Sequence, residues 1–294
     1  MVKGERVTQL QAQISGPPMG AASMGSMRDT ADWRPLIPAV VSFCVATVLL
    51  IPLEWFVPGL IVWGLCAVLV ARSGRADVRR NLGLLLGCLL VLGFAPINTN
   101  RDTRHFIELA SAFGAVIFVP YLWMRWKAPH QLDWRFLPRK FWWRDIIYVA
   151  ISFPLAWAII QLYFFTLNPE MPTHWPMPVE PTDDALRRLF IGINAVGIWD
   201  ELFFINTVYV LLRALLPARV ANAAQAVVYT SVLYHMAFTG WGFLIVYLFA
   251  LTQGAMYERS GILLWVLIVH LVVDYFLVLA ILQYHYPGHG LVLF

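Results

Sequence analysis

Hydrophobic positions in this chain fall into long runs rather than into the alternating patterns of a soluble domain. From residue 36 onward, apolar runs of about 17 to 28 residues are separated by short polar breaks. An α-helix needs about 20 apolar residues to cross the hydrocarbon core of a bilayer. We count nine such runs, at about 36–53, 55–71, 82–97, 106–124, 146–166, 189–216, 222–238, 241–256 and 261–282. The pattern predicts an all-α, polytopic membrane protein with about eight to nine transmembrane helices.

Two details of this pattern bear on the helix count and on helix packing. The turn at Thr239-Gly240 is so short that the seventh and eighth runs could form a re-entrant hairpin instead of two spans. Gly83 and Gly87 form a GxxxG pair, which is typical of helices that pack closely in membranes. Glu108, about one turn inside the fourth run, is expected to be an interfacial carboxylate without a chemical role.

Composition supports the membrane class and argues against two others. Of the 294 residues, 60% are hydrophobic and 13% are charged, whereas an ordinary soluble protein has about 25% charged residues. The net charge of +4 does not require a nucleic-acid partner, because basic residues accumulate in the cytoplasmic loops of membrane proteins. Cys44, Cys66 and Cys88 all lie in apolar runs, so we expect no disulfide framework.

The chain divides into four regions. Residues 1–34 are rich in Gly, Ser, Met and Gln and are expected to be a disordered cytoplasmic tail without a secretory signal peptide. Residues 35–166 hold the N-terminal transmembrane helices, and 167–188 form a Pro-rich, acidic loop. Residues 189–294 form a transmembrane core, in which we expect any catalytic residues.

The distribution of cations predicts the orientation. With the N-terminus in the cytoplasm, all but four of the 21 Lys and Arg fall on the cytoplasmic side, the exceptions being Arg101, Arg104, Arg187 and Arg188. The stretch Trp134–Arg144 alternates aromatic and basic residues, which favours an anchor at the membrane interface. We therefore expect a multi-pass protein of a bacterial-type inner membrane.

The final third of the chain carries ionisable residues inside apolar runs. Asp200 and Glu201 are adjacent in the middle of the sixth run, His235 lies in the seventh, and His270 and Asp274 are four residues apart in the ninth. An ionisable side chain near the bilayer centre costs about 3 kcal/mol on insertion scales, so each needs a partner or a function. We predict that these five side chains, from three helices, converge on one cavity.

A carboxylate beside an imidazole at low dielectric constant suits the activation of water for hydrolysis. The carboxylate can act as the base, and the imidazole can donate to the developing oxyanion. The same residue types also suit a proton or ion pathway, so a transporter function is an alternative interpretation. There is no His-Glu-x-x-His motif and no Gly-x-Ser-x-Gly motif, which argues against the zinc and serine types of protease.

The order of these motifs resembles a family of intramembrane proteases, the CAAX protease and bacteriocin-processing (CPBP) family. Its pattern has a Glu-Glu pair followed by xxx-Arg, then Phe-xxx-His, then His-xxx-Asn or Asp. The corresponding segments here are Asp200-Glu201, Ser231-Val-Leu-Tyr-His235 and His270-xxx-Asp274. Tyr257-Glu258-Arg259 also resembles the Tyr-Glu-Arg-Thr-Gly turn of the family. The resemblance covers residues 187–285 and departs from the pattern at Asp200, Ile205 and Ser231, where Glu, Arg and Phe are expected.

The resemblance implies hydrolysis of a peptide bond by a metal-free, glutamic-type mechanism. Asp200 would activate water with help from His235, and His270 with Asp274 would orient the water or stabilise the oxyanion. Glu201 would lie behind them or serve as the base itself. No cofactor is expected, although two His and a carboxylate could also hold zinc.

The expected partners are the lipid bilayer and a membrane protein or peptide as substrate, with no nucleic acid. Two alternatives stay open, because the Arg of the pattern is missing at Ile205. The chain could be an inactive relative that acts as a scaffold or immunity protein, or a proton-coupled transporter.

Overall fold

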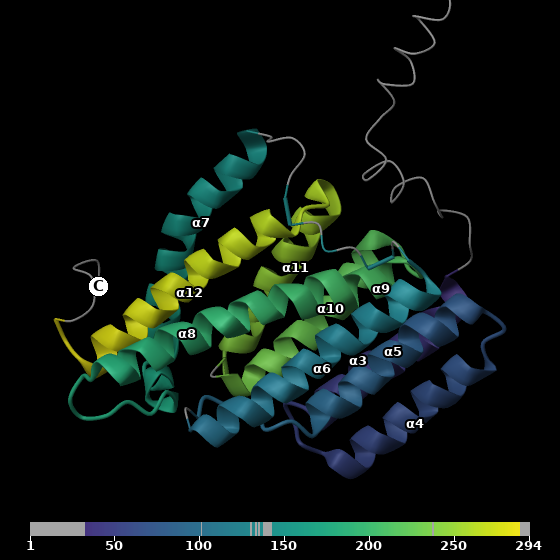
Figure 1. Ribbon diagram of the computed structural model, residues 1–294, viewed down its shortest axis with the longest axis horizontal. Coiled ribbons are helices and arrows are strands. Elements are labelled where there is room, and N and C mark those ends of the chain that lie inside the picture. Colours follow the sequence, from purple (N-terminus) through teal and green to yellow (C-terminus); the bar gives the residue numbers. More distant parts are fainter. Residues whose placement is uncertain are drawn as a thin grey trace, which may run out of the picture.

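The computed structural model describes residues 33–100, 102–129, 131, 132, 134, 136, 137, 143–236 and 238–288. Within these ranges the chain is built from helices and contains no strand (Figure 1). The all-α prediction is therefore confirmed. The predicted tail, apart from Trp33 and Arg34, and much of the stretch 134–144 lie outside the described residues.

Each of the nine predicted apolar runs coincides with a helix or a continuous series of helices in the described part of the chain. The N-terminal half contains η1 (Arg34–Leu36), α3 (Ile37–Leu50), α4 (Phe56–Arg72), α5 (Ala76–Gly93), α6 (Thr103–Lys127), α7 (Trp143–Leu162) and η2 (Tyr163–Leu167). The C-terminal half contains η3 (Met171–His174), α8 (Asp183–Asp200), η4 (Glu201–Tyr209), α9 (Val210–Arg213), α10 (Ala218–Leu233), η5 (Tyr234–Met236), α11 (Gly242–Ser260) and α12 (Leu263–His285).

Among the described residues, four helical segments are long and apolar enough to cross a membrane. They are Thr103–Lys127, Trp143–Leu167, Asp183–Arg213 and Leu263–His285, and the shorter segments Arg34–Leu50 and Phe56–Arg72 are also apolar. The chain is accordingly a polytopic membrane protein. The count of eight to nine spans stays a prediction.

The sixth helix begins six residues earlier than the hydrophobic run suggests. Thr182 precedes α8, and its side-chain oxygen accepts a hydrogen bond from the backbone N–H of Ala185 at 3.3 Å. Asp183 and Asp184 occupy the first turn, where negative charge interacts favourably with the helix dipole. Polar capping residues therefore extend the helix into the region 167–188, which the sequence assigned to a loop.

The GxxxG prediction is wrong for this fold. A Cβ atom built on Gly83 or Gly87 would meet no atom within 4 Å, so neither glycine permits a close approach of another helix. Gly59 does so instead, because a Cβ there would lie 2.6 Å from Cδ2 of Leu50. Close packing of α3 against α4 therefore depends on Gly59.

The helices form one bundle in which the segment around η4 is central. In Figure 1, α3, α4 and α5 lie on one side of α8 to α10, and α7 and α12 lie on the other. Eight of the nine residues of η4 are buried, and α10 and α11 pack together against it. The acidic doublet at the α8–η4 junction is consequently held in the interior.

The two ends of the bundle differ in the segments they contain. One, here called the Trp175 end, comprises residues 98–100, 102–105 and 171–178, the start of α8 and the end of α12. Tyr286 Oη, for example, donates to the carbonyl of Pro178 at 2.6 Å. The other, the Glu258 end, comprises Arg213, Asp145 and residues 257–262; Arg213 Nε lies 3.0 Å from Oε1 of Glu258. The charge pattern of the sequence predicts that the Glu258 end faces the cytoplasm.

Candidate functional site

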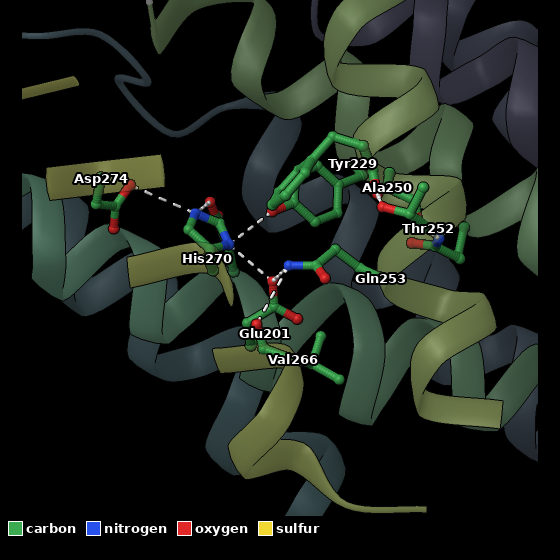
Figure 2. A network of polar contacts seen from close by, with 11 residues as sticks. Glu201, Tyr229, Ala250, Thr252, Gln253, Val266, His270 and Asp274 are labelled. Carbon is green, nitrogen blue, oxygen red and sulfur yellow. Dashed lines mark hydrogen bonds and ion pairs between the residues drawn. The ribbon is translucent and has the colours of Figure 1, made fainter. Parts of the chain in front are cut away.

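The imidazole of His270 lies at the centre of three carboxyl groups. Its Nδ1 is 2.7 Å from Oε1 of Glu201, and its Nε2 is 3.6 Å from Oδ2 of Asp200 and 3.5 Å from Oδ1 of Asp274. Figure 2 shows the ring between Glu201 and Asp274. All four residues are buried, with at most 4% of their surface exposed. Four of the five predicted site residues therefore converge.

Local helix geometry explains how adjacent carboxyl groups reach one ring. Asp200 is the last residue of α8 and Glu201 the first of η4, which is a π-helix of nine residues. Side chains at adjacent helical positions point in different directions, so the two carboxyl groups approach opposite nitrogens of the ring. Asp274 lies one turn after His270 on α12 and therefore shares its face. π-helical turns are frequent at functional sites.

Two residues that the sequence did not single out complete the network on the Nδ1 side. Tyr229 Oη, on α10, is 3.0 Å from Nδ1 of His270. Gln253 Nε2, on α11, donates to Oε1 of Glu201 at 3.2 Å and to the carbonyl of Val266 at 3.3 Å. A glutamine in an apolar helix needs hydrogen-bond partners, and that signal could have identified Gln253. Tyr229 gives no comparable signal, since tyrosines are common in apolar helices.

Gly197 provides the space in which Asp274 lies. A Cβ at Gly197 would overlap Oδ2 of Asp274 and would come within 3.1 Å of Cδ2 of His270. Since Gly197 is about one turn before Asp200 on α8, the absence of a side chain lets α12 bring its carboxylate against α8. No pattern in the sequence distinguishes this glycine from the others in the apolar helices.

One oxygen of each carboxyl group has no hydrogen-bond partner among the described residues. These buried atoms are Oδ1 of Asp200, Oε2 of Glu201 and Oδ2 of Asp274. Buried polar atoms are normally hydrogen-bonded, so these oxygens are suited to bind a water molecule or a polar group of a ligand. The cluster thus combines hydrogen-bond acceptors with an imidazole that can donate.

The prediction that His235 joins the cluster is wrong. His235 follows α10 in η5, where its Nε2 is 3.0 Å from the carbonyl oxygen of Ile51 and 3.6 Å from Oε1 of Glu54. Both partners belong to the connection between α3 and α4. A 3₁₀ turn at the end of α10 changes the helical phase, and the ring is thereby directed to this connection rather than to His270.

A cavity of about 500 Å³ leads to the cluster. Asp200, His270 and Asp274 line it, whereas Glu201 and Tyr229 do not. Its walls are mainly apolar side chains from α6, α7, α8, α11 and α12, and its polar lining includes Asn98, Asn100, His105 and Arg188. Cavities of this size with few polar groups are typical ligand sites.

The zinc alternative needed two histidines, and the cluster contains one. Among the residues that the structure describes, no group of three His, Cys, Asp or Glu side chains has the arrangement of a metal site.

Two groups of residues outside the cluster were also considered in the sequence. The three cysteines are free thiols. Glu108 forms an exposed ion pair with Arg104 at 2.8 Å.

The turn after α11 is a structural support. Tyr257 Oη donates to Oδ1 of Asn206 at 3.3 Å, and Glu258 accepts from Tyr209 Oη at 2.6 Å. Arg259 Nη1 donates to Tyr148 Oη at 2.7 Å, and Gly261 ends the helix with φ of 63°. The turn therefore fixes α11 to η4 and α7.

Comparison with known families identifies the segment that carries this cluster. Residues 183–276 match the model of the family described as "Rce1-like: Type II CAAX prenyl endopeptidase Rce1-like". The match spans α8 to α12, including all four converging residues. No curated protein and no solved structure matches the chain. This match supports an intramembrane protease of the CAAX-protease type in general terms.

Proposed function

We propose that this chain, whose residues 183–276 belong to the Rce1-like family, is an intramembrane endopeptidase that uses Asp200 to activate water. The observation that carries this proposal is the position of Asp200. Its Oδ2 faces Nε2 of His270 at 3.6 Å, and Asp200 is among the residues that line the cavity. A base and a potential donor are thus side by side where a substrate can enter.

In the proposed reaction, Asp200 removes a proton from a water molecule, and the water oxygen forms a bond to the carbonyl carbon of the peptide. The carbonyl π electrons move to its oxygen, and that oxyanion is stabilised by the Nε2–H of His270, whose ring is doubly protonated because its Nδ1–H donates to Glu201. The oxyanion electron pair then re-forms the C=O bond and the C–N bond breaks, as the protonated Asp200 gives its proton to the leaving amine. No cofactor is required for this sequence of steps.

Asp274 and Glu201 act from the two sides of the imidazole. Asp274 faces Nε2 at 3.5 Å and lines the cavity, so it orients the water together with Asp200. Glu201 is fully buried and accepts from Nδ1 at 2.7 Å, which fixes the ring from behind. His235 has no part in the reaction.

The Arg of the family pattern is missing, but other groups are placed to stabilise a carboxylate of the acidic doublet. Ile205, at the corresponding position, is fully buried in the hydrophobic core. Glu201 instead has a neutral amide donor, Gln253, and the imidazole of His270. We infer that these two groups together stabilise the carboxylate that the Arg would have paired.

The experiment that tests this function compares the membrane and secreted proteomes of cells that carry the wild-type chain or Asp200→Asn. The substitution preserves the side-chain volume and removes the base. We expect a discrete set of proteins to persist uncut in the variant. Gly87→Ala is the matched control, because a Cβ there meets nothing within 4 Å, and its proteome should equal the wild type.

Two outcomes would contradict the proposal. If Asp200→Asn leaves every precursor processed while the cell phenotype is kept, the chain acts as a scaffold or immunity protein. If the purified wild-type chain in vesicles carries out flux driven by a pH gradient and cuts no protein, it is a proton-coupled transporter.

A further inference from the structure

The cluster lies closer to one end of the bundle than to the other. His270 is seven residues after the first residue of α12 and 15 before the last. At 1.5 Å per residue these separations are about 10 Å to the Glu258 end and about 22 Å to the Trp175 end. Depth alone would therefore favour access from the Glu258 end.

The Glu258 end, however, is closed beneath the cluster. Tyr209, Asn206 and Tyr257 are buried there, with no more than 4% of their surface exposed. Tyr257 is hydrogen-bonded to Asn206 at 3.3 Å, and Tyr209 to Glu258 at 2.6 Å. Gln253 joins α11 to the carbonyl of Val266 on α12 at 3.3 Å. This layer of aromatic rings and hydrogen bonds separates His270 from the short route.

The cavity runs in the opposite direction. Its lining extends from Asp200 along α8 to Arg188 and reaches Asn98, Asn100 and Trp175, all at the Trp175 end. At its side it includes Leu155 and Leu162 of α7 and Leu248 of α11, which are 54%, 50% and 55% exposed. In a bilayer such exposed leucines face lipid. The cavity is thus bordered by lipid at its side and by polar loops at the Trp175 end.

A peptide carbonyl inside an intact helix is already hydrogen-bonded to the backbone, so a segment whose peptide bond is cleaved must be extended at the cluster. Arg188 and Asp200 are 12 residues apart on α8, or about 18 Å. An extended chain rises about 3.3 Å per residue and covers this distance with five or six residues.

We infer that the cluster receives an extended, apolar segment of a membrane-anchored protein that enters from the Trp175 end, which the charge pattern places outside the cytoplasm. This inference rests on the proposed function and specifies its substrate. The scissile bond lies about five or six residues beyond the point where the segment passes Arg188. The anchor stays in the lipid beside α7 and α11.

The direction of access can be measured without a substrate. In a chain whose three native cysteines are replaced by alanine, single cysteines are introduced and labelled with a membrane-impermeant maleimide in intact spheroplasts and in inverted vesicles. Ile193→Cys reports on the cavity, which Ile193 lines. Val179→Cys reports on the Trp175 end, where Val179 is 97% exposed, and Arg219→Cys, at the exposed start of α10, reports on the opposite end.

We expect Ile193→Cys and Val179→Cys to react in spheroplasts at least about tenfold faster than in inverted vesicles, since thiol reactivity follows exposure, and Arg219→Cys to show the reverse. Reaction of Ile193→Cys together with Arg219→Cys, or from neither side, would overturn the inferred route. Reaction of Val179→Cys only in inverted vesicles would overturn its placement outside the cytoplasm.

The result is independent of catalysis. The same labelling in an Asp200→Asn background should be unchanged. A failed protease test therefore does not affect the conclusion about the direction of access, and a failed labelling test does not affect the conclusion about proteolysis. Should the alanine-substituted chain accumulate poorly, the wild-type chain serves as background, because Cys66 and Cys88 are buried and Cys44 is half-buried.

Discussion

Oε1 of Glu201 lies 2.7 Å from Nδ1 of His270, and neither residue has more than 4% of its surface exposed. The contact orients the imidazole so that Nε2 is directed at Asp200, Asp274 and the cavity. The adjacent residues Asp200 and Glu201 therefore face different nitrogens of the His270 ring. Their substitutions should consequently have different effects.

Asp200→Asn should lower kcat on an identified substrate by about 10³-fold, since a general base contributes about 10² to 10⁴. Glu201→Gln should lower it by about tenfold to a hundredfold, because the amide oxygen still accepts from Nδ1 of His270 at the cost of a charge-assisted bond. Cleavage of that substrate by the purified variants in detergent measures both. A larger loss in Glu201→Gln than in Asp200→Asn would exchange the two proposed roles.

His235→Ala should keep nearly full activity. The substitution removes the hydrogen bond to the carbonyl oxygen of Ile51, which contributes about 1 kcal/mol to stability. A lowered midpoint of thermal unfolding with unchanged kcat is the expected pair of results. His270→Ala, measured alongside, should abolish activity. A loss of kcat in His235→Ala equal to that in His270→Ala would place both rings in the reaction.

Gly197→Ala should inactivate the enzyme with little loss of folded protein. The added Cβ overlaps Oδ2 of Asp274 and displaces it from His270. Gly83→Ala is a helix-interior glycine with open space around its Cβ, so it should be neutral or stabilising by about 0.5–1 kcal/mol. Activity per folded molecule, measured after size-exclusion chromatography, separates the two. Equal activity of the two variants would show that the position of Asp274 is unimportant.

Gln253→Met removes the amide donor to Glu201 with little change in volume. Loss of one hydrogen bond to a charged group corresponds to about 1.5–3 kcal/mol, and we expect kcat to fall by about tenfold to a hundredfold. Because Gln253 acts through Glu201 and His270, the pH profile of kcat should also change. If the variant is less abundant but keeps the wild-type pH profile of kcat, Gln253 has only a structural role.

Activity should survive strong chelators. The proposed steps need no metal, and the cluster offers one imidazole rather than the two of the zinc alternative. Cleavage is measured after dialysis against 1,10-phenanthroline, with and without added zinc. Loss of activity that zinc restores would replace the metal-free scheme with a zinc-dependent one.

Residue spacing alone predicted the helical architecture and four members of the buried cluster. Runs of apolar residues long enough to cross a bilayer indicate helices, because backbone groups in lipid must be hydrogen-bonded within the segment. Asp200, Glu201, His270 and Asp274 stood out because ionisable groups in such runs are costly. The first and last residues of the helices were less well predicted, because polar capping residues such as Thr182 extend a helix beyond its apolar run.

Tertiary structure decided which of the polar residues meet. His235 and His270 look alike in the sequence, yet the 3₁₀ turn after α10 sends the first to Ile51, while α12 directs the second between Asp200 and Glu201. Gly197 differs from Gly83 only in what faces it across the bundle. Spacing within one helix fixes the face on which a side chain lies, but the partner on that face depends on how separate helices pack.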